Sequence, residues 1–219
     1  MEKKEFLKDL EAAKNRYPFL DYEYLEGKEY PYKITEDFEI SDNEGNHWGT
    51  FRASVYFHSR YPKEFPLLKD LSKAFPCEAD WHISPRDGDC CVCGIIEQEE
   101  RARSGISILN FIDVYVLSFY ANQLYKKHFG HYKNGEYAHD VEGVWEALEE
   151  EFNTKDRKEI RRFLKEMKIK RGRNTVCFCG SGVKYKRCHL DRKRIIENVI
   201  KRASSYTTAL NNQQLFECL

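Results

Sequence analysis

Apolar and polar positions repeat with two different periods along the first sixty residues. Residues 1–16 carry apolar side chains three or four positions apart, which predicts a short amphipathic helix. Tyr17-Pro18 ends this helix, because a proline disfavours helical backbone in the residue before it. Residues 22–25, 32–40 and 48–57 are rich in aromatic and β-branched side chains and alternate with a period of two. The pattern predicts a helix followed by an antiparallel meander of strands.

A helical period dominates the second half of the chain. A wide apolar stripe along residues 106–129 predicts a long helix that is largely buried against the sheet. Residues 141–152 predict another helix with its apolar side inward, and residues 155–169 a charged helix that leads out of the core. A basic helix is expected over residues 191–202. Residues 79–96 show no period and are expected to form an irregular loop.

These elements predict an α+β protein whose antiparallel meander sheet is flanked by helices, with a small module at the C-terminus. The expected domains are residues 1–153 for the sheet and its helices, 154–174 for a charged helix and basic linker, and 175–219 for the C-terminal module. A domain of about 150 residues buries enough surface to fold alone.

The composition limits which classes of partner and which cellular compartment we expect. Lysine plus arginine and aspartate plus glutamate both total 36, so the net charge predicts neither a membrane nor a nucleic acid as partner. No apolar run approaches the roughly 20 residues of a membrane span, and the start of the chain lacks the apolar stretch of a signal peptide. We therefore expect a cytoplasmic protein whose eight cysteines are thiols or metal ligands rather than disulfides.

The densest chemistry lies in residues 81–93, which read W-H-I-S-P-R-D-G-D-C-C-V-C. Cys90, Cys91 and Cys93 all follow the turn residue Gly88. One interpretation is a metal site in which Cys90 and Cys93 join Cys77 and His82, since four such ligands suit zinc. The other is a reactive thiol, because a cysteine in a glycine turn beside a cation such as Arg86 is favoured as thiolate.

The order of motifs resembles the ubiquitin-conjugating enzyme (UBC) family over roughly residues 1–152. In that family, Tyr-Pro-Phe-x-x-Pro-Pro precedes His-Pro-Asn, and Gly-x-x-Cys-Leu carries the catalytic cysteine. Tyr61-Pro62 and Pro66 match the first motif, His82 matches the histidine, and residues 88–92 match the last. The resemblance places Cys91 at the thioester position and implies an acyl transferase that passes an activated protein C-terminus to an amine.

The chain departs from the family where His82-Ile83-Ser84 replaces His-Pro-Asn. Ser84 then stands in the place of the asparagine that stabilises the oxyanion, and a preorganised donor of that kind is worth about 3 kcal/mol. This departure fits divergent bacterial enzymes that resemble the standalone conjugating enzyme of CBASS antiphage operons. It equally fits a catalytically inactive UBC fold that serves as a binding module.

Further roles follow from the resemblance. A loop after the long helix borders the active site in the family, so Glu136, His139 and Asp140 are candidates to assist the amine. The acyl donor would be a ubiquitin-like protein or, as in CBASS, a cGAS-like nucleotidyltransferase. The chain has no Gly-rich phosphate loop, so a separate activating protein is expected.

The second dense stretch, residues 177–189, closely resembles the SEC-C motif, a small zinc-binding module. Its ligands would be Cys177, Cys179, Cys188 and His189, a soft set that suits a structural zinc ion. Gly180-Ser181-Gly182 lets the backbone turn between the two ligand pairs. The basic residues around it favour an acidic protein face as the partner, and a nucleic acid is the weaker alternative.

Overall fold

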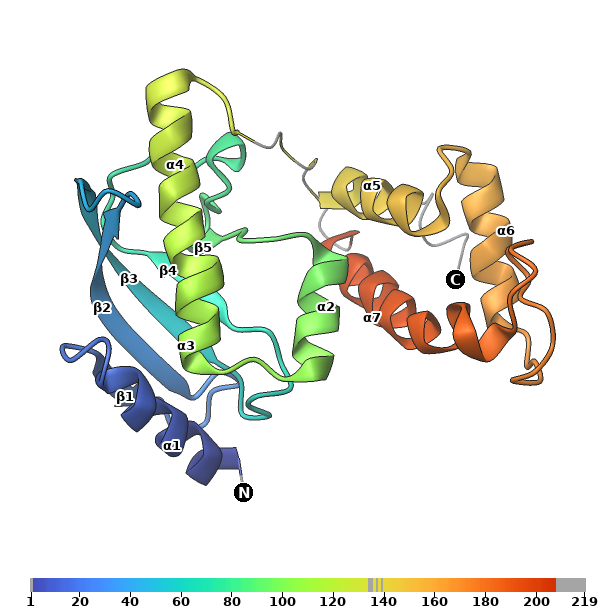
Figure 1. Ribbon diagram of the computed structural model, residues 1–219, viewed down its shortest axis with the longest axis horizontal. Coiled ribbons are helices and arrows are strands. Elements are labelled where there is room, and N and C mark those ends of the chain that lie inside the picture. Colours follow the sequence, from blue (N-terminus) through green and yellow to red (C-terminus); the bar gives the residue numbers. More distant parts are fainter. Residues whose placement is uncertain (1, 134–135, 137, 139, 208–219) are drawn as a thin grey trace. The chain divides into compact units, whose positions relative to one another are not determined.

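The computed structural model describes residues 2–133, 136, 138 and 140–207, with the backbone alone for residues 2, 140, 141 and 203–207. The chain divides into two compact units. We call Met1–Cys93 with Glu100–Glu136 the sheet unit, and Gly94–Glu99 with Tyr137–Leu219 the helical unit. Figure 1 shows the elements of each unit.

An antiparallel meander of five strands forms the centre of the sheet unit, in the order of the chain. This arrangement confirms the predicted antiparallel sheet, and three strands lie within a residue or two of their predicted ranges. The fifth strand falls in the segment that was expected to be irregular. The strands are β1 (Asp21–Tyr24), β2 (Tyr32–Ser41), β3 (His47–Phe57), β4 (Leu67–Asp70) and β5 (Asp89–Cys90).

One face of this sheet carries the apolar core. The register pairs Tyr32 with Phe57 and Phe38 with Phe51, so the large side chains of β2 and β3 gather on the same side. Helix α1 (Glu2–Lys14) covers this face through Phe6, whose ring stacks on Tyr32 with a centroid separation of 4.4 Å. The alternation that predicted the strands therefore arises because one face packs against helices.

A second helical segment crosses the same face (Figure 1). It runs as α3 (Ile108–Phe111), a single π-helical stretch η2 (Ile112–Val116) and α4 (Leu117–Phe129), close to the predicted range of 106–129. Ser107 caps its start by accepting a hydrogen bond from the Asn110 N–H. Tyr120 stacks on Phe51 with ring centroids 4.7 Å apart, which fixes the helix on the sheet.

The Tyr61-Pro62 dipeptide ties three parts of the sheet unit together. The buried Tyr61 hydroxyl donates to Asp9 Oδ2 of α1 over 2.5 Å and accepts from the Ile108 N–H over 3.2 Å. The Pro62 carbonyl accepts from the Ile106 N–H over 2.9 Å. This segment thus holds the start of α3 beside α1. It also supplies acceptors for two backbone N–H groups, which need a hydrogen-bond partner when they are buried.

The helical unit has its own core. Helices α5 (Asp140–Phe152), α6 (Arg157–Lys168) and α7 (His189–Thr207) enclose it, and the first half of α2 (Ile95–Ser104) packs against it. Arg192 of α7 makes a two-pronged ion pair with Glu151 of α5, whose side chain is only 9% exposed. The buried side chains of α6 are Ile160, Phe163, Leu164 and Met167.

This core differs from the predicted domain organisation. The expected boundary at residue 153 falls inside a unit that joins α5 to α6 and α7. The charged helix expected over residues 155–169 is present as α6, but it packs into this core and does not lead out of it. The spacing of Ile160, Phe163, Leu164 and Met167 is that of an amphipathic stripe, which the high charge of α6 obscures. Helix α2 was also missed, since only Ile95, Ile96 and Ala102 in it are apolar. No helix within the described residues is long and apolar enough to cross a membrane.

Candidate functional site

The thiol loop, residues 82–91, is a short antiparallel hairpin. Ile83 and Cys90 form a bridge, and the Ser84 N–H donates to the Asp89 carbonyl over 2.8 Å. The tip is closed by the Gly88 N–H, which donates to the Ser84 carbonyl over 3.0 Å. Gly88 has a φ of 73°, a backbone conformation that glycine adopts without strain. The hairpin therefore places Cys91 beside His82, and the Cys91 N–H donates to the His82 carbonyl over 2.8 Å.

The three cysteines of this stretch differ in environment. Cys90 packs against the core, its thiol donates to the Gly88 carbonyl at 3.6 Å, and burial raises the pKa of that thiol far above its usual value. Cys93 is half-buried and also packs against the core. Cys91 is exposed. A buried thiol of raised pKa is inert, so Cys90 is the least reactive of the three, and Cys91 is the most exposed.

The alternative metal site is not assembled. Cys77 is exposed, whereas Cys90 faces the core. Within the described part of the chain, the one group of three or more Cys, His, Asp or Glu side chains close enough to hold a metal ion lies in the helical unit. Cys77, His82, Cys90 and Cys93 therefore do not act as a ligand set in this structure.

His82 lies in a small polar cluster. Its backbone is left-handed, with a φ of 51°, and its ring lies 5.0 Å from that of Tyr132. The His82 Nε2 atom is 3.9 Å from the Glu136 carboxylate, and Lys126 Nζ is 3.4 Å from the other Glu136 oxygen. Lys126 also lies over the Tyr132 ring at 4.4 Å. Sequence reasoning named Glu136 but missed Tyr132 and Lys126, which resemble ordinary residues at the end of a helix.

Ser84 has a role inside the turn. Its Oγ atom accepts a hydrogen bond from the Arg86 N–H over 3.3 Å. Its hydroxyl donates to Asp87, and this hydrogen bond is the main reason that the pKa of the Asp87 carboxyl is lowered. The hydroxyl that was expected to face an oxyanion is thus engaged in closing the hairpin.

Two of the predicted site residues receive no placement. His139 lies outside the described residues, and Asp140 is described by its backbone alone, as the first residue of α5.

The second site is the knuckle at the start of α7. A small hairpin forms where Val176 bridges Lys184 and the Cys177 N–H donates to the Val183 carbonyl over 2.8 Å. Gly180 and Gly182 have φ values of 79° and 72°, so the turn between the two ligand pairs favours glycine at these positions. Cys188 directly precedes α7, which begins at His189.

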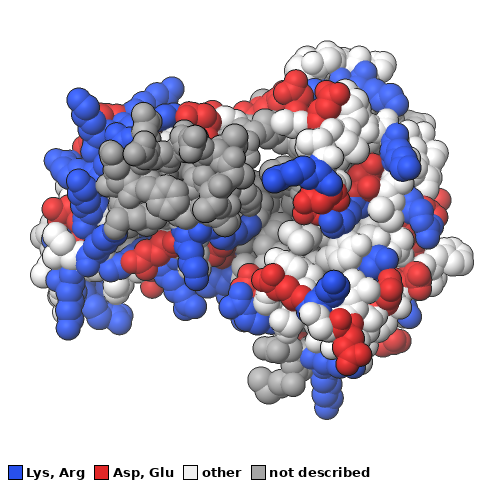
Figure 2. All heavy atoms as spheres, turned by 180° about the vertical axis from the view of Figure 1, so that it is seen from behind, with Lys and Arg blue, Asp and Glu red and all other residues white. Residues whose placement is uncertain are grey.

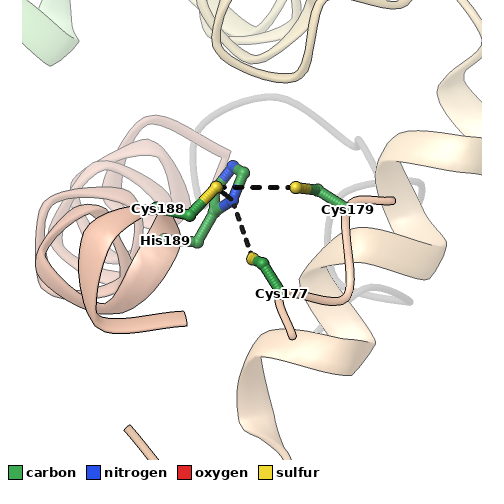
Figure 3. A group of neighbouring side chains, drawn as sticks. All are labelled: Cys177, Cys179, Cys188 and His189. Carbon is green, nitrogen blue, oxygen red and sulfur yellow. Dashed lines mark hydrogen bonds between the residues drawn. The ribbon is translucent and has the colours of Figure 1, made fainter. Parts of the chain in front are cut away.

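The four ligand atoms of the knuckle converge (Figure 3). All of them lie within 4.8 Å of one another. The Cys179 and Cys188 sulfurs are 3.6 Å apart, and His189 Nδ1 is 3.3 Å from the Cys177 sulfur and 3.1 Å from that of Cys188. The knuckle thus brings together the residues that its spacing predicted.

Residues 173–191 match the SEC-C motif. No curated protein matches the chain, and no solved structure matches it. The match confirms the predicted SEC-C motif, and its range includes both ligand pairs of the knuckle.

The SEC-C ligands fit a zinc ion. Tetrahedral zinc, with bonds of about 2.3 Å to sulfur and about 2.0 Å to nitrogen, holds neighbouring ligand atoms roughly 3.5–3.8 Å apart. Three of the six separations are 3.1–3.6 Å, close to these values, and all six lie within 4.8 Å. Burial lowers the pKa of His189, which favours the neutral imidazole that a metal requires. Bound zinc would supply a covalent-like crosslink between the hairpin and α7.

The surroundings of the SEC-C ligands orient them. The His189 ring stacks on Phe152 of α5, with centroids 5.6 Å apart, and Phe178 lies 5.3 Å away. Burial raises the pKa of Cys179, but hydrogen bonds with Ser181, Cys188 and Cys177 together outweigh it and lower that pKa overall. Ser181 was visible in the sequence only as a turn residue, and the structure adds a role beside the thiols.

Proposed function

We propose that this chain is a UBC-like acyl carrier of a bacterial conjugation system. It receives an activated protein C-terminus on Cys91 as a thioester and transfers it to an amine. The order of elements supports this proposal. Helix α1, the antiparallel meander, the Tyr61-Pro62 segment, the thiol loop and the long helix follow one another as the resemblance to the UBC family requires.

The exposure of Cys91 is the observation that carries the proposal. Its two neighbours in the cluster are partly buried against the core, whereas Cys91 lies outside it and its backbone is hydrogen-bonded to His82. A nucleophile that must meet a protein-sized donor needs this combination of access and a fixed backbone.

The chemistry proceeds in two balanced steps. The Cys91 thiolate attacks the carbonyl carbon of a donor thioester, a new C–S bond forms, and the donor thiolate leaves and takes up a proton. An amine then attacks the Cys91 thioester, a C–N bond forms, the C–S bond breaks, and the amine proton passes to the Cys91 sulfur. In this proposal the amine proton travels by way of the Glu136 carboxylate, which lies 3.9 Å from His82 Nε2, before it reaches the sulfur.

Lys126 is placed to hold Glu136 in position. Its ammonium lies between Glu136 and the Trp81 and Tyr132 rings, and it also donates to the Asp80 carbonyl. The negative charge that develops on the thioester oxygen needs a donor, and Ser84 is occupied in the turn. A backbone or lysine donor is therefore assigned this role in the proposal.

The SEC-C module serves as a docking element in this scheme. Lysine and arginine side chains line the margin of the helical unit in Figure 2, and around the knuckle Lys184, Arg187 and Arg173 are exposed. Their charge suits an acidic protein surface. By the resemblance to CBASS enzymes, the donor is a ubiquitin-like protein or a cGAS-like nucleotidyltransferase, activated by a separate protein in the cytoplasm during antiphage defence.

One observation favours a second candidate function. Because the Ser84 hydroxyl closes the hairpin, the loop lacks the side-chain donor that the family places before the catalytic cysteine. A UBC fold without this donor would act as a binding module with a zinc-stabilised docking tail.

Intact mass spectrometry of the protein, produced together with its genomic neighbours, separates the two functions. We expect a protein-sized adduct that a thiol reductant removes, that Cys91→Ala abolishes, and that Cys91→Ser retains as a reductant-resistant ester. Cys93→Ala is the matched control and keeps the adduct. An adduct that survives Cys91→Ala would refute the assignment of Cys91, and absence of any adduct from the wild-type protein would favour the binding module.

A further inference from the structure

The chain passes between the two units at three places, and two of them lie beside residues of the thiol-loop region. The first part of the sheet unit ends at Cys93, two residues after Cys91, and the helical unit begins at Gly94. The chain returns to the sheet unit within α2, between Glu99 and Glu100, and leaves it again after Glu136, the residue that faces His82. Segment 94–99 of the helical unit is therefore the direct continuation of the cysteine cluster.

Segment 94–99 is firmly held inside the helical unit. Glu99, with a side chain only 13% exposed, pairs with Arg202 of α7 over 2.9 Å and accepts from the Asn198 amide over 3.1 Å. Arg202 also donates to Gln98 over 2.8 Å. Ile95 and Ile96 pack against the core that α7 shares with α5 and α6. Charge-assisted contacts and apolar burial thus fix this segment to the second half of α7.

The other end of α7 is the SEC-C knuckle. His189, a ligand residue, is the first residue of the helix, and Arg202 lies thirteen residues further on. At a rise of 1.5 Å per residue, about 20 Å of continuous helix separates the two. The same rigid element therefore holds a metal ligand at one end and the continuation of the cysteine cluster at the other.

The connection from segment 94–99 to the thiols is short and structured. The Gly94 carbonyl accepts from the Gln98 N–H over 3.0 Å, so it belongs to the first turn of α2. Cys93, directly before it, is half-buried against the core of the sheet unit. If segment 94–99 is released from α7, residues 91–93, which follow β5, lose an attachment on their C-terminal side, and Cys93 becomes accessible more often.

We infer that Arg202 and Asn198 are positioning residues for residues 91–93, and that metal binding at the SEC-C knuckle, transmitted along α7, sets the accessibility of Cys93 and the order of Cys91. The significance of this coupling for acyl transfer rests on the proposed function, whereas the coupling itself does not. It predicts that the zinc module regulates the thiol loop in addition to any docking role.

Pulse alkylation of the full-length, zinc-loaded protein tests the inference, with the labelled cysteines identified by peptide mass spectrometry. Glu99→Arg and Arg202→Glu each place like charges together. We expect each variant to raise the labelling rate of Cys93 by about threefold to fivefold, because loss of a partly buried ion pair changes the opening equilibrium by about that factor. The double variant restores opposite charges and should return the rate towards that of the wild type. Lys201→Glu, the same charge change at the exposed neighbouring residue, should leave it unchanged, and exposed Cys77 is the internal reference.

A second experiment, in which the metal site is disrupted, tests the other end of α7. Removing zinc by chelation, or purifying His189→Ala, should make buried Cys177 reactive and raise Cys93 labelling by at least the same factor. The inference would be overturned if Cys177 became reactive while the labelling rate of Cys93 stayed unchanged. It would also be overturned if the Cys93 labelling rate were unchanged in both ion-pair variants, or if it rose equally in Lys201→Glu. No acyl donor is needed in these assays, so a protein that never forms an adduct but shows the expected labelling would refute the proposed function and leave the coupling intact.

Discussion

The Cys91 N–H donates a hydrogen bond to the His82 carbonyl oxygen over 2.8 Å. The contact joins two residues that lie nine positions apart, and it uses backbone atoms on both sides. The His82 imidazole itself faces Glu136 and Tyr132.

Variants of His82 can separate its backbone from its ring. Asparagine tolerates the left-handed conformation of φ 51°, whereas a β-branched residue does not. We expect His82→Val to lower the free energy of unfolding by about 1–2 kcal/mol more than His82→Asn, as measured by urea denaturation. Equal losses in the two variants would show that the ring, not the backbone, determines stability at this position.

The three thiols should differ in reactivity and in their response to pH. Burial raises the pKa of Cys90, so its thiolate fraction at neutral pH is far below that of an exposed cysteine. We expect iodoacetamide to label Cys91 before Cys93 and to leave Cys90 unlabelled up to pH 9, as read by peptide mass spectrometry. Early labelling of Cys90 would contradict its burial.

The raised pKa of Cys90 also makes the free energy of unfolding depend on pH. Because the folded-state pKa of Cys90 is raised, its contribution to stability is complete below the pKa of an unfolded cysteine, about 8.5, and decreases as the pH rises above that value. Urea denaturation at pH 7 and pH 9.5 should show a smaller pH-dependent loss in Cys90→Ala than in the wild type.

Tyr61 should be important for the stability of the sheet unit. Removing its hydroxyl in Tyr61→Phe leaves the buried Ile108 N–H without its acceptor, and we expect a loss of about 1–3 kcal/mol in the free energy of unfolding. Tyr24→Phe, at a residue 46% exposed, is the control and should change it by less than about 0.5 kcal/mol. A Tyr61 variant as stable as the control would contradict the assigned role.

The knuckle should bind a single zinc ion per chain. Native mass spectrometry is expected to show this ion in the wild type and in Ser181→Ala, and to show its loss in Cys177→Ala or Cys188→Ala. Because protons compete for the cysteines and for His189, the metal should dissociate as the pH is lowered. Stoichiometric zinc in Cys188→Ala would show that the ligand set is incorrect.

Local patterns predicted the secondary structure of the sheet unit because each strand exposes one face and buries the other. That burial produces the period of two in β2 and β3 and the apolar stripe of the long helix, so both patterns can be recognised in the sequence. The same reasoning predicted α6 as a helix but not its burial, because its charged residues outnumber its apolar stripe, and it missed β5, which is too short to show a period.

The sequence by itself determined the knuckle, because its four ligands lie within thirteen residues and two glycines set the turn between them. Only the tertiary structure decided how the first cysteine cluster is divided. Burial against the sheet makes Cys90 inert, the hairpin leaves Cys91 exposed, and Glu136 reaches His82 from a distant part of the chain. The ligands are close together in the sequence, so their spacing can be recognised without the fold. Burial and charge pairing depend on elements that only folding brings together.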